Sequence, residues 1–430
     1  MKRGILTLSI ALLWTMAVAQ QATITGRVNQ AEALVRLLIY DDLLTMHETE
    51  VARTTSDAQG FFLLEGNVDQ TTPARIAVGL ESVDLVVAPG ASYQLTITLP
   101  EVDPSNSYFE RPLPALRIKT ASDNGLYRQI LISDQITNDY VLEYFDALYR
   151  RRQYRYLDSI KTAIDRELGD CGTYVNQYNS YRIASVQMAV NADGGKKVIS
   201  EYYDGKPVLY RCQSYMDLFK DLFKNNTLDE GFLKRNPQLA EMINLYRLRN
   251  YYNEEPRARK SVREQIQRLR AKTQFVETRQ LADHVLAEFD RFATGATAPD
   301  FALKDASGAM VKLSDFKDRM VVLQFVEGGS ATVDHQFETL SDLHRQWQDS
   351  VQLITISTKD QFQQYGKRFQ EHRYDWPLLN LGNDVLLLER YEVRTFPEYF
   401  IILPGTKIGM APAPSPDQTL DKHVTRLYGK

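Results

Sequence analysis

The sequence has only two cysteines among its 430 residues, and it has no strong excess of charge of either sign. Two cysteines form at most one disulfide, which excludes a disulfide-stapled scaffold. The 51 basic and 55 acidic side chains give a formal net charge of −4, so we expect no general attraction for nucleic acid or anionic lipid. A hydrophobic fraction of 43% excludes intrinsic disorder and predicts several ordinary globular domains, with no cofactor needed for folding.

Long apolar runs are also scarce, and the only extended one is at the N-terminus. Lys2 and Arg3 precede a largely apolar stretch, and Ala17-Val18-Ala19 resembles a small-residue cleavage site. This pattern predicts a signal peptide over residues 1–19. An N-terminal anchor helix is the less favoured alternative, because the stretch is too short to span a bilayer comfortably. We therefore expect an exported protein without an integral membrane segment after signal removal.

Residues 20–117 alternate between apolar and polar side chains with a period of two, and turn residues separate the alternating runs. This pattern predicts a β-sandwich domain. The stretch from Thr54 to Phe62 resembles the turn and strand of carboxypeptidase-regulatory-like domains, which implies a binding or spacing module. Asp57 within it is interpreted as a turn residue, with a calcium ligand as the less favoured alternative.

Residues 118–294 have a helical period of 3.6, which predicts an all-α domain. Two stretches of this segment, 144–156 and 246–252, are rich in tyrosine and arginine. Such stretches can bind a partner through aromatic and cation–π contacts. Amphipathic helices whose tyrosines cover the core, with arginines extending into solvent, are the simpler explanation, because acidic residues are interleaved throughout.

Residues 295–430 alternate strands with helices, as in an α/β domain. The stretch from Met320 to Val326 predicts a buried strand, and Val351 to Ser357 predicts a second one. The prolines between Ala411 and Pro416 predict a loop without regular structure, and a last helix is expected over 417–427. The whole chain is thus predicted to be a multidomain α+β protein.

The last segment resembles the thioredoxin-like fold, and within it the TlpA and ResA type of thiol-disulfide oxidoreductases. The resemblance rests on Ala298-Pro299-Asp300-Phe301, on Lys312-Leu313-Ser314-Asp315-Phe316, and on Val321 to Phe325. It also includes Tyr391 to Pro397, which matches the segment that holds the family's cis-proline. The order of domains is similar to that of TlpA-like proteins of Gram-negative envelopes, and implies a periplasmic or secreted location.

The catalytic motif of that family is missing from this chain. The resemblance aligns Ser330 with the attacking cysteine of the C-x-x-C motif and Val333 with the resolving one. A serine hydroxyl cannot replace the thiolate, because its pKa is far higher and it forms no exchangeable disulfide. A catalytic role for Ser330 with Asp334 and His335 is disfavoured, since a helix points two adjacent residues in different directions. We therefore predict no catalytic residue in this domain.

The two cysteines, Cys171 and Cys212, lie in the helical segment and are 41 positions apart. In an oxidising compartment a structural disulfide between them is the main prediction, worth about 4 kcal/mol in the chain-entropy model. Two free thiols or a redox-active pair are the alternatives. The six histidines are scattered singly, so no metal site is predicted.

The resemblance implies that Thr395, Phe396 and Pro397 form a loop that presents backbone groups to an extended peptide, with a cis bond before the proline. The main hypothesis is a catalytically degenerate module that binds a polypeptide or envelope protein at this groove. One alternative is a thiol-disulfide oxidoreductase that uses Cys171 and Cys212. Another is a structural adaptor whose ligand binds in the helical domain.

Overall fold

The structure is a computed structural model that describes residues 20–79, 81–100, 115–122, 125–191, 193, 195–327, 331–347, 350–358, 361–382, 384, 386–393 and 395–429. The predicted signal peptide, residues 1–19, lies outside this range. The chain folds into two compact units that divide between Asn236 and Pro237. Among the described residues, no helix has the length and apolar character needed to cross a membrane.

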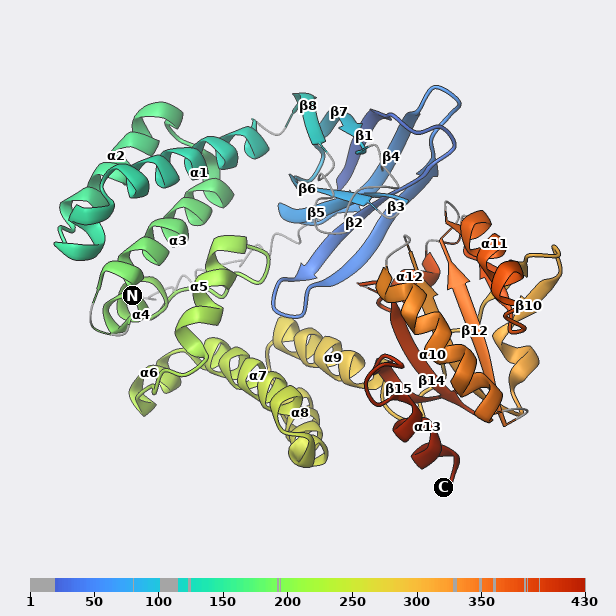
Figure 1. Cartoon of the computed structure of the whole chain (residues 1–430). Coiled ribbons are helices and arrows are strands. Elements are labelled where there is room, and N and C mark those ends of the chain that lie inside the picture. The colour runs from blue at the N-terminus through green and yellow to red at the C-terminus, as the bar shows by residue number, and fades with distance from the viewer. Residues whose placement is uncertain are drawn as a thin grey trace, which may run out of the picture. The chain divides into compact units, whose positions relative to one another are not determined.

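The first unit begins with a β-sandwich, as predicted (Figure 1). One sheet has the strand order β4-β1-β7-β8 and the other has the order β3-β2-β5-β6. Along β4, exposed and buried residues alternate strictly, so one face of the strand joins the core and the other faces solvent. The strands are β1 (Gln20–Val28), β2 (Leu34–Asp42), β3 (His47–Thr55), β4 (Phe61–Val68), β5 (Thr72–Val78), β6 (Glu81–Val87), β7 (Ser92–Thr98) and β8 (Ala115–Ala121).

The turn between β3 and β4 shows what Asp57 does. Its Oδ1 accepts hydrogen bonds from the backbone N–H groups of Gln59, at 2.9 Å, and Phe61, at 2.8 Å. Gly60 has a φ of +83°, which a glycine adopts without steric cost. Asp57 is therefore a turn-forming residue, and the interpretation that was favoured from the sequence is confirmed.

Helices complete the first unit, and they pack around a core rich in aromatic side chains. The rings of Tyr181, Tyr203 and Tyr215 are buried and lie 4.8–5.6 Å apart between centroids. The helices are α1 (Leu126–Glu143), a π-helical turn (Asp146–Arg150), α2 (Arg155–Leu168), α3 (Gly172–Val190), α4 (Lys196–Tyr202), α5 (Gln213–Phe223) and α6 (Glu230–Arg235).

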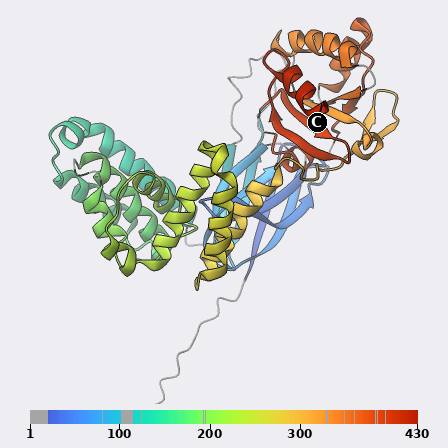
Figure 2. The same ribbon diagram turned by 90° about the horizontal axis from the view of Figure 1, so that it is seen from below.

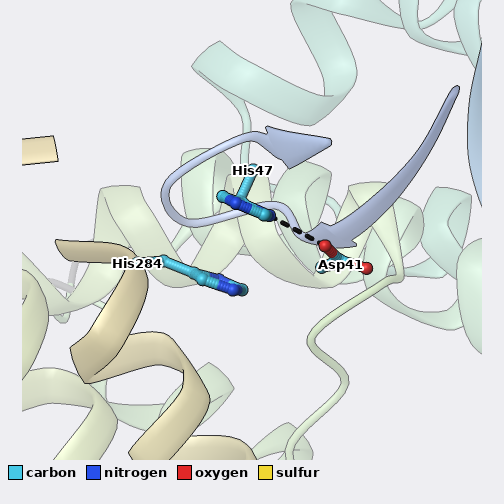
Figure 3. A group of neighbouring side chains, drawn as sticks. All are labelled: Asp41, His47 and His284. Carbon is cyan, nitrogen blue, oxygen red and sulfur yellow. Dashed lines mark hydrogen bonds and ion pairs between the residues drawn. The ribbon is translucent and has the colours of Figure 1, made fainter. Parts of the chain in front are cut away.

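Arg211 links these helices to the sandwich. Its guanidinium donates to the backbone carbonyl of Asp41 at 3.1 Å and to Oδ1 of Asp69 at 2.7 Å. Oδ2 of Asp41 accepts from Thr49 and lies 2.8 Å from Nδ1 of His47, an interaction marked in Figure 3. The β2–β3 hairpin is thereby fixed to the segment that precedes α5.

The second unit begins with three helices, α7 (Pro237–Glu254), α8 (Arg259–Lys272) and α9 (Val276–Arg291). The helical region that the sequence placed in one domain is thus shared between the two units. Arg249 on α7 forms a bidentate pair with Glu288 on α9, at 2.8 and 3.0 Å. The rings of Tyr252 and Phe289 stack beside it.

The rest of the second unit is an α/β domain around a seven-stranded sheet, as predicted (Figure 1; Figure 2). The strand order is β10-β9-β13-β12-β11-β14-β15, and β11, β12 and β13 are parallel. All seven residues of β11 are buried, so it forms the centre of the domain. The strands are β9 (Ala302–Asp305), β10 (Met310–Lys312), β11 (Met320–Val326), β12 (Val351–Ser357), β13 (Leu378–Asn380), β14 (Glu398–Leu403) and β15 (Lys407–Ala413).

Helices cover both faces of this sheet. α10 (Ala331–Trp347), α11 (Phe362–His372) and α13 (Leu420–Tyr428) bury their apolar residues in the core on one face. α12 (Leu386–Arg390) packs against the core on the other face. The expectation of an irregular segment from Ala411 to Pro416 was wrong for Ala411 to Ala413, which belong to β15, and is confirmed for residues 414–416, which lie in neither a helix nor a strand. β15 is an edge strand, so one of its sides has no neighbouring strand. Proline has no N–H to donate, and it is tolerated in an edge strand because no hydrogen bond to a neighbouring strand is needed on that side.

Candidate functional site

The end of β11 and the start of α10 form the position where the resemblance expects a dithiol. β11 ends at Val326, and α10 begins at Ala331. Ser330, the residue aligned with the attacking cysteine, lies outside the described residues. Val333, aligned with the resolving cysteine, is 1% exposed and belongs to the core between α10 and the sheet. An aliphatic side chain thus fills the resolving position.

The residue directly after Val333 forms an ion pair. Asp334 of α10 pairs with the guanidinium of Arg368 on α11. Burial raises the pKa of Tyr365 above its usual range, the negative charge of Asp334 adds to this shift, and Arg368 opposes it. Tyr365 therefore keeps its proton at neutral pH. Because Arg368 neutralises Asp334, the pair is not a ligand set for a metal ion.

His335 points away from this ion pair. Its side chain is 70% exposed, and Nε2 lies 3.7 Å from a carboxylate oxygen of Asp417. Nδ1 lies 3.9 Å from Glu338 on the same helix. Asp334 and His335 thus interact with different neighbours, as the sequence argument expected, and the two do not orient each other as a base and its carboxylate would.

The loop that contains Thr395, Phe396 and Pro397 lies at the same end of the sheet as the end of β11. β14 follows this loop directly and runs antiparallel to β11, with Glu398 opposite Phe325 and Tyr399 opposite Gln324. The peptide bond between Phe396 and Pro397 is cis, so the expected cis bond is confirmed. Thr395 is exposed, and Phe396 and Pro397 are half-buried. Thr395 therefore lies at the surface of this domain.

A buried chain of hydrogen bonds, which we call the polar relay, lies between the sheet and α10. Nε1 of Trp376 donates to Thr355 at 3.0 Å, and the Thr355 hydroxyl donates to Oε1 of Gln324 at 3.0 Å. Nε2 of Gln324 donates to the Tyr399 hydroxyl at 2.8 Å, which donates in turn to Oε1 of Gln336 at 2.8 Å. All five residues are at most 5% exposed.

The polar relay joins α10 to β14, the strand that follows the Thr395–Pro397 loop. Gln336 belongs to α10, and Tyr399 is two residues after Pro397. Sequence analysis did not identify the relay. The available signal was a glutamine and a threonine, Gln324 and Thr355, inside strands that were otherwise apolar, since a buried amide or hydroxyl requires a partner.

The state of the two cysteines differs from the predicted disulfide. Cys171 and Cys212 are both free thiols in the structure, so the expected disulfide is not formed there. Each sulfur has a local partner instead: Cys171 donates to the Gly169 carbonyl at 3.6 Å, and Cys212 lies 3.6 Å from Oγ of Ser214. Burial raises the pKa of both thiols, and the carboxylates of Asp170 and Asp165 raise that of Cys171 further.

Raised pKa values disfavour a redox role for these cysteines, because the thiolate is the nucleophile. We expect the unreduced protein, once unfolded, to take up an alkylating reagent at both Cys171 and Cys212. In the native protein at pH 7, both should react more slowly than free cysteine, and the rates should rise as the pH is increased. Intact-mass spectrometry measures the uptake. A Cys171–Cys212 linked peptide in a map of the unreduced protein would contradict this prediction.

Comparison with known proteins agrees with the fold of the C-terminal domain. Residues 294–410 match the model of the AhpC/TSA family. The thiol-disulfide oxidoreductase ResA of Bacillus subtilis (strain 168) is 23% identical over 125 residues, which are 29% of this chain and 69% of ResA. These matches confirm the predicted thioredoxin-like domain and its similarity to thiol-disulfide oxidoreductases.

Solved structures of similar domains come from several bacteria. A putative thiol-disulfide oxidoreductase from Bacteroides vulgatus is 19% identical with a TM-score of 0.30, and it covers 32% of this chain and 98% of its own. A putative thiol:disulfide interchange protein DsbE from Chlorobium tepidum is 20% identical with a TM-score of 0.29, and it covers 32% of this chain and 99% of its own.

Proposed function

We propose that this is an exported protein whose thioredoxin-like domain binds a polypeptide instead of exchanging disulfides. The position of the Thr395–Pro397 loop beside the end of β11, in a domain without cysteine, is the observation that carries the proposal. The resemblance implies that relatives of this type hold a substrate at this loop, while the cysteines that react are absent from this domain of the sequence.

The chemistry of the domain supports a loss of redox activity. The sequence contains no cysteine after Cys212, so the whole α/β domain lacks a thiol. Neither a hydroxyl at Ser330 nor the buried side chain of Val333 can form a mixed disulfide. The raised pKa values of the two distant thiols oppose a replacement of the dithiol by Cys171 and Cys212.

The geometry of the domain supports binding. An extended peptide can pair with the free backbone N–H and C=O groups of such a loop through main-chain hydrogen bonds, with neighbouring pockets for alternate side chains. The polar relay holds β14, the strand that follows the loop, against α10, and a fixed loop reduces the entropy that binding would cost. The expected partner is a polypeptide or an envelope protein, in the periplasm or outside the cell.

Site-specific photo-crosslinking tests the proposal. A photo-reactive p-benzoylphenylalanine placed at Thr395 should form adducts with a distinct polypeptide in the cell envelope. The matched control carries the same group at Ala306, an exposed position in the turn between β9 and β10. In parallel, the wild-type protein should not accelerate the reduction of insulin by dithiothreitol.

The crosslinking and insulin experiments distinguish peptide binding from disulfide exchange. An adduct that forms from Thr395, is absent from Ala306, and is suppressed by excess unlabelled protein supports a groove partner. Equal adducts from both positions, or none from either, would refute the binding proposal. Insulin reduction that disappears in a Cys171→Ser variant would instead support the oxidoreductase.

A further inference from the structure

The outer face of the sheet with the order β4-β1-β7-β8 carries large apolar side chains that do not contribute to the core. Phe61 and Leu63 on β4 are 54% and 49% exposed, and they alternate with the buried residues Phe62 and Leu64. Exposed apolar residues on a regular sheet face are informative when polar groups of one kind surround them.

The strand register places these residues in two rows across the sheet. In the first row, Arg27 of β1 stands between Phe61 of β4 and Thr96 of β7. In the second row, Thr25 stands between Leu63 and Gln94. Each row thus combines an apolar side chain with hydroxyl, amide or cationic groups at the spacing of adjacent strands, about 4.8 Å.

Arg27 is held in a defined position. Its guanidinium carbon lies 5.4 Å from the centroid of the Phe61 ring, and Nε donates to the carbonyl of Gln59 at 3.1 Å. One face of the guanidinium is thereby occupied by the ring. The N–H groups on the two terminal nitrogens of Arg27 are the ones that donate two parallel hydrogen bonds to a carboxylate.

The two rows border a hollow with a volume of about 450 Å³, within the range of small-molecule sites, about 300–1,000 Å³. Lys119 of β8 adds a second cation, and no carboxylate is among the described residues that line the hollow. The local charge is therefore positive in a chain whose net charge is −4. The six side chains that define the site are Thr25, Arg27, Phe61, Gln94, Thr96 and Lys119.

We propose that this face binds an anionic polysaccharide, a chain of sugars that carry carboxylates. Arg27 and Lys119 match the carboxylates, Thr25 and Thr96 offer hydroxyls to the sugar hydroxyls, and the Phe61 ring offers apolar surface to the C–H groups of a pyranose. This site lies in the N-terminal sandwich and is independent of the function proposed for the C-terminal domain.

The sheet geometry favours a glycan over an acidic peptide. The backbone of β1 is paired with β4 on one side and with β7 on the other, so this face offers side chains and no free main-chain ladder. Peptides that bind to sheets use that ladder at an edge. A ligand with many hydroxyls and regularly spaced charges instead matches what the face presents.

Fluorescence anisotropy with labelled polygalacturonate oligomers tests the proposal on the full chain. The wild-type protein should bind them, and high salt should weaken the binding because it screens the carboxylates. Arg27→Gln and Phe61→Ala should each weaken binding by roughly tenfold or more, as expected for central anchors of a site. Two control variants away from this face, Arg53→Gln on β3 and Met46→Ala in the turn between β2 and β3, should keep the wild-type affinity.

Two further ligands separate an anionic polysaccharide from a neutral polysaccharide and from an acidic peptide. Neutral dextran oligomers should not bind, and poly-glutamate should bind more weakly than polygalacturonate. Circular dichroism confirms that each variant is folded, and Phe61→Leu replaces Phe61→Ala if the latter unfolds. The proposal is overturned if wild type does not bind polygalacturonate, if Arg27→Gln binds as tightly as wild type, or if poly-glutamate binds with equal affinity.

Discussion

The double substitution Ser330→Cys with Val333→Cys is expected to create insulin reductase activity in a protein for which we propose none. Position 333 lies in the first turn of α10, and position 330 directly precedes the helix. A helix N-terminus lowers the pKa of a thiol through its dipole and free N–H groups. With dithiothreitol as reductant, we expect turnover on the order of tenfold above the uncatalysed rate, because the helix end and the Thr395–Pro397 loop are still present.

The single substitutions are the controls for this experiment. Ser330→Cys alone lacks the resolving thiol, and Val333→Cys alone lacks the attacking one, so neither should sustain turnover. Val333 is buried, and cysteine behaves as a small hydrophobe, so the cost in stability should be modest. If the double variant is folded, forms its disulfide and still shows no turnover, more than the two cysteines has been lost from this site.

Tyr399→Phe is expected to lower the free energy of unfolding by about 2–4 kcal/mol, which is a large effect for the loss of one oxygen atom. The hydroxyl accepts from Gln324 and donates to Gln336, so its removal leaves two buried amide groups without their partner. Each buried polar group left unpaired costs about 1–3 kcal/mol. Urea denaturation followed by circular dichroism measures the change.

Tyr428→Phe is the matched control, because it removes the same hydroxyl from a side chain that is 58% exposed. Its expected effect is within about 0.5 kcal/mol. An equal, small effect in both variants would contradict a structural role for the polar relay. Photo-crosslinking from Thr395 in the Tyr399→Phe variant tests a separate point. It shows whether the polar relay also positions the Thr395–Pro397 loop.

Much of the architecture followed from periodicity alone. Alternation with a period of two predicted the sandwich, and the period of 3.6 predicted the helices between 118 and 294. These two features are local, because each depends on which side chains recur on one face of a strand or helix. The thioredoxin-like domain was predicted differently, from the resemblance that the ordered motifs between Ala298 and Pro397 bear to a known family.

Contacts between distant residues could not be predicted in the same way. The polar relay joins Gln324 to Tyr399 across 75 positions, and Arg211 contacts Asp41 across 170. Such pairs depend on strand order and register, and a shift of one residue would turn every side chain to the opposite face. The predicted disulfide was wrong for a related reason, since sequence separation does not say where two side chains point.

The sequence by itself determined what chemistry the C-terminal domain lacks, because a chain without cysteine after position 212 cannot exchange disulfides there. Only the tertiary structure decided which residues lie together at the surfaces that we propose for binding. The antiparallel pairing of β14 with β11 placed the Thr395–Pro397 loop at the empty site. The pairing of β1 with β4 and β7 brought Arg27, Phe61 and Thr96 into one row, because hydrogen-bonded strands align residues that are far apart in the chain.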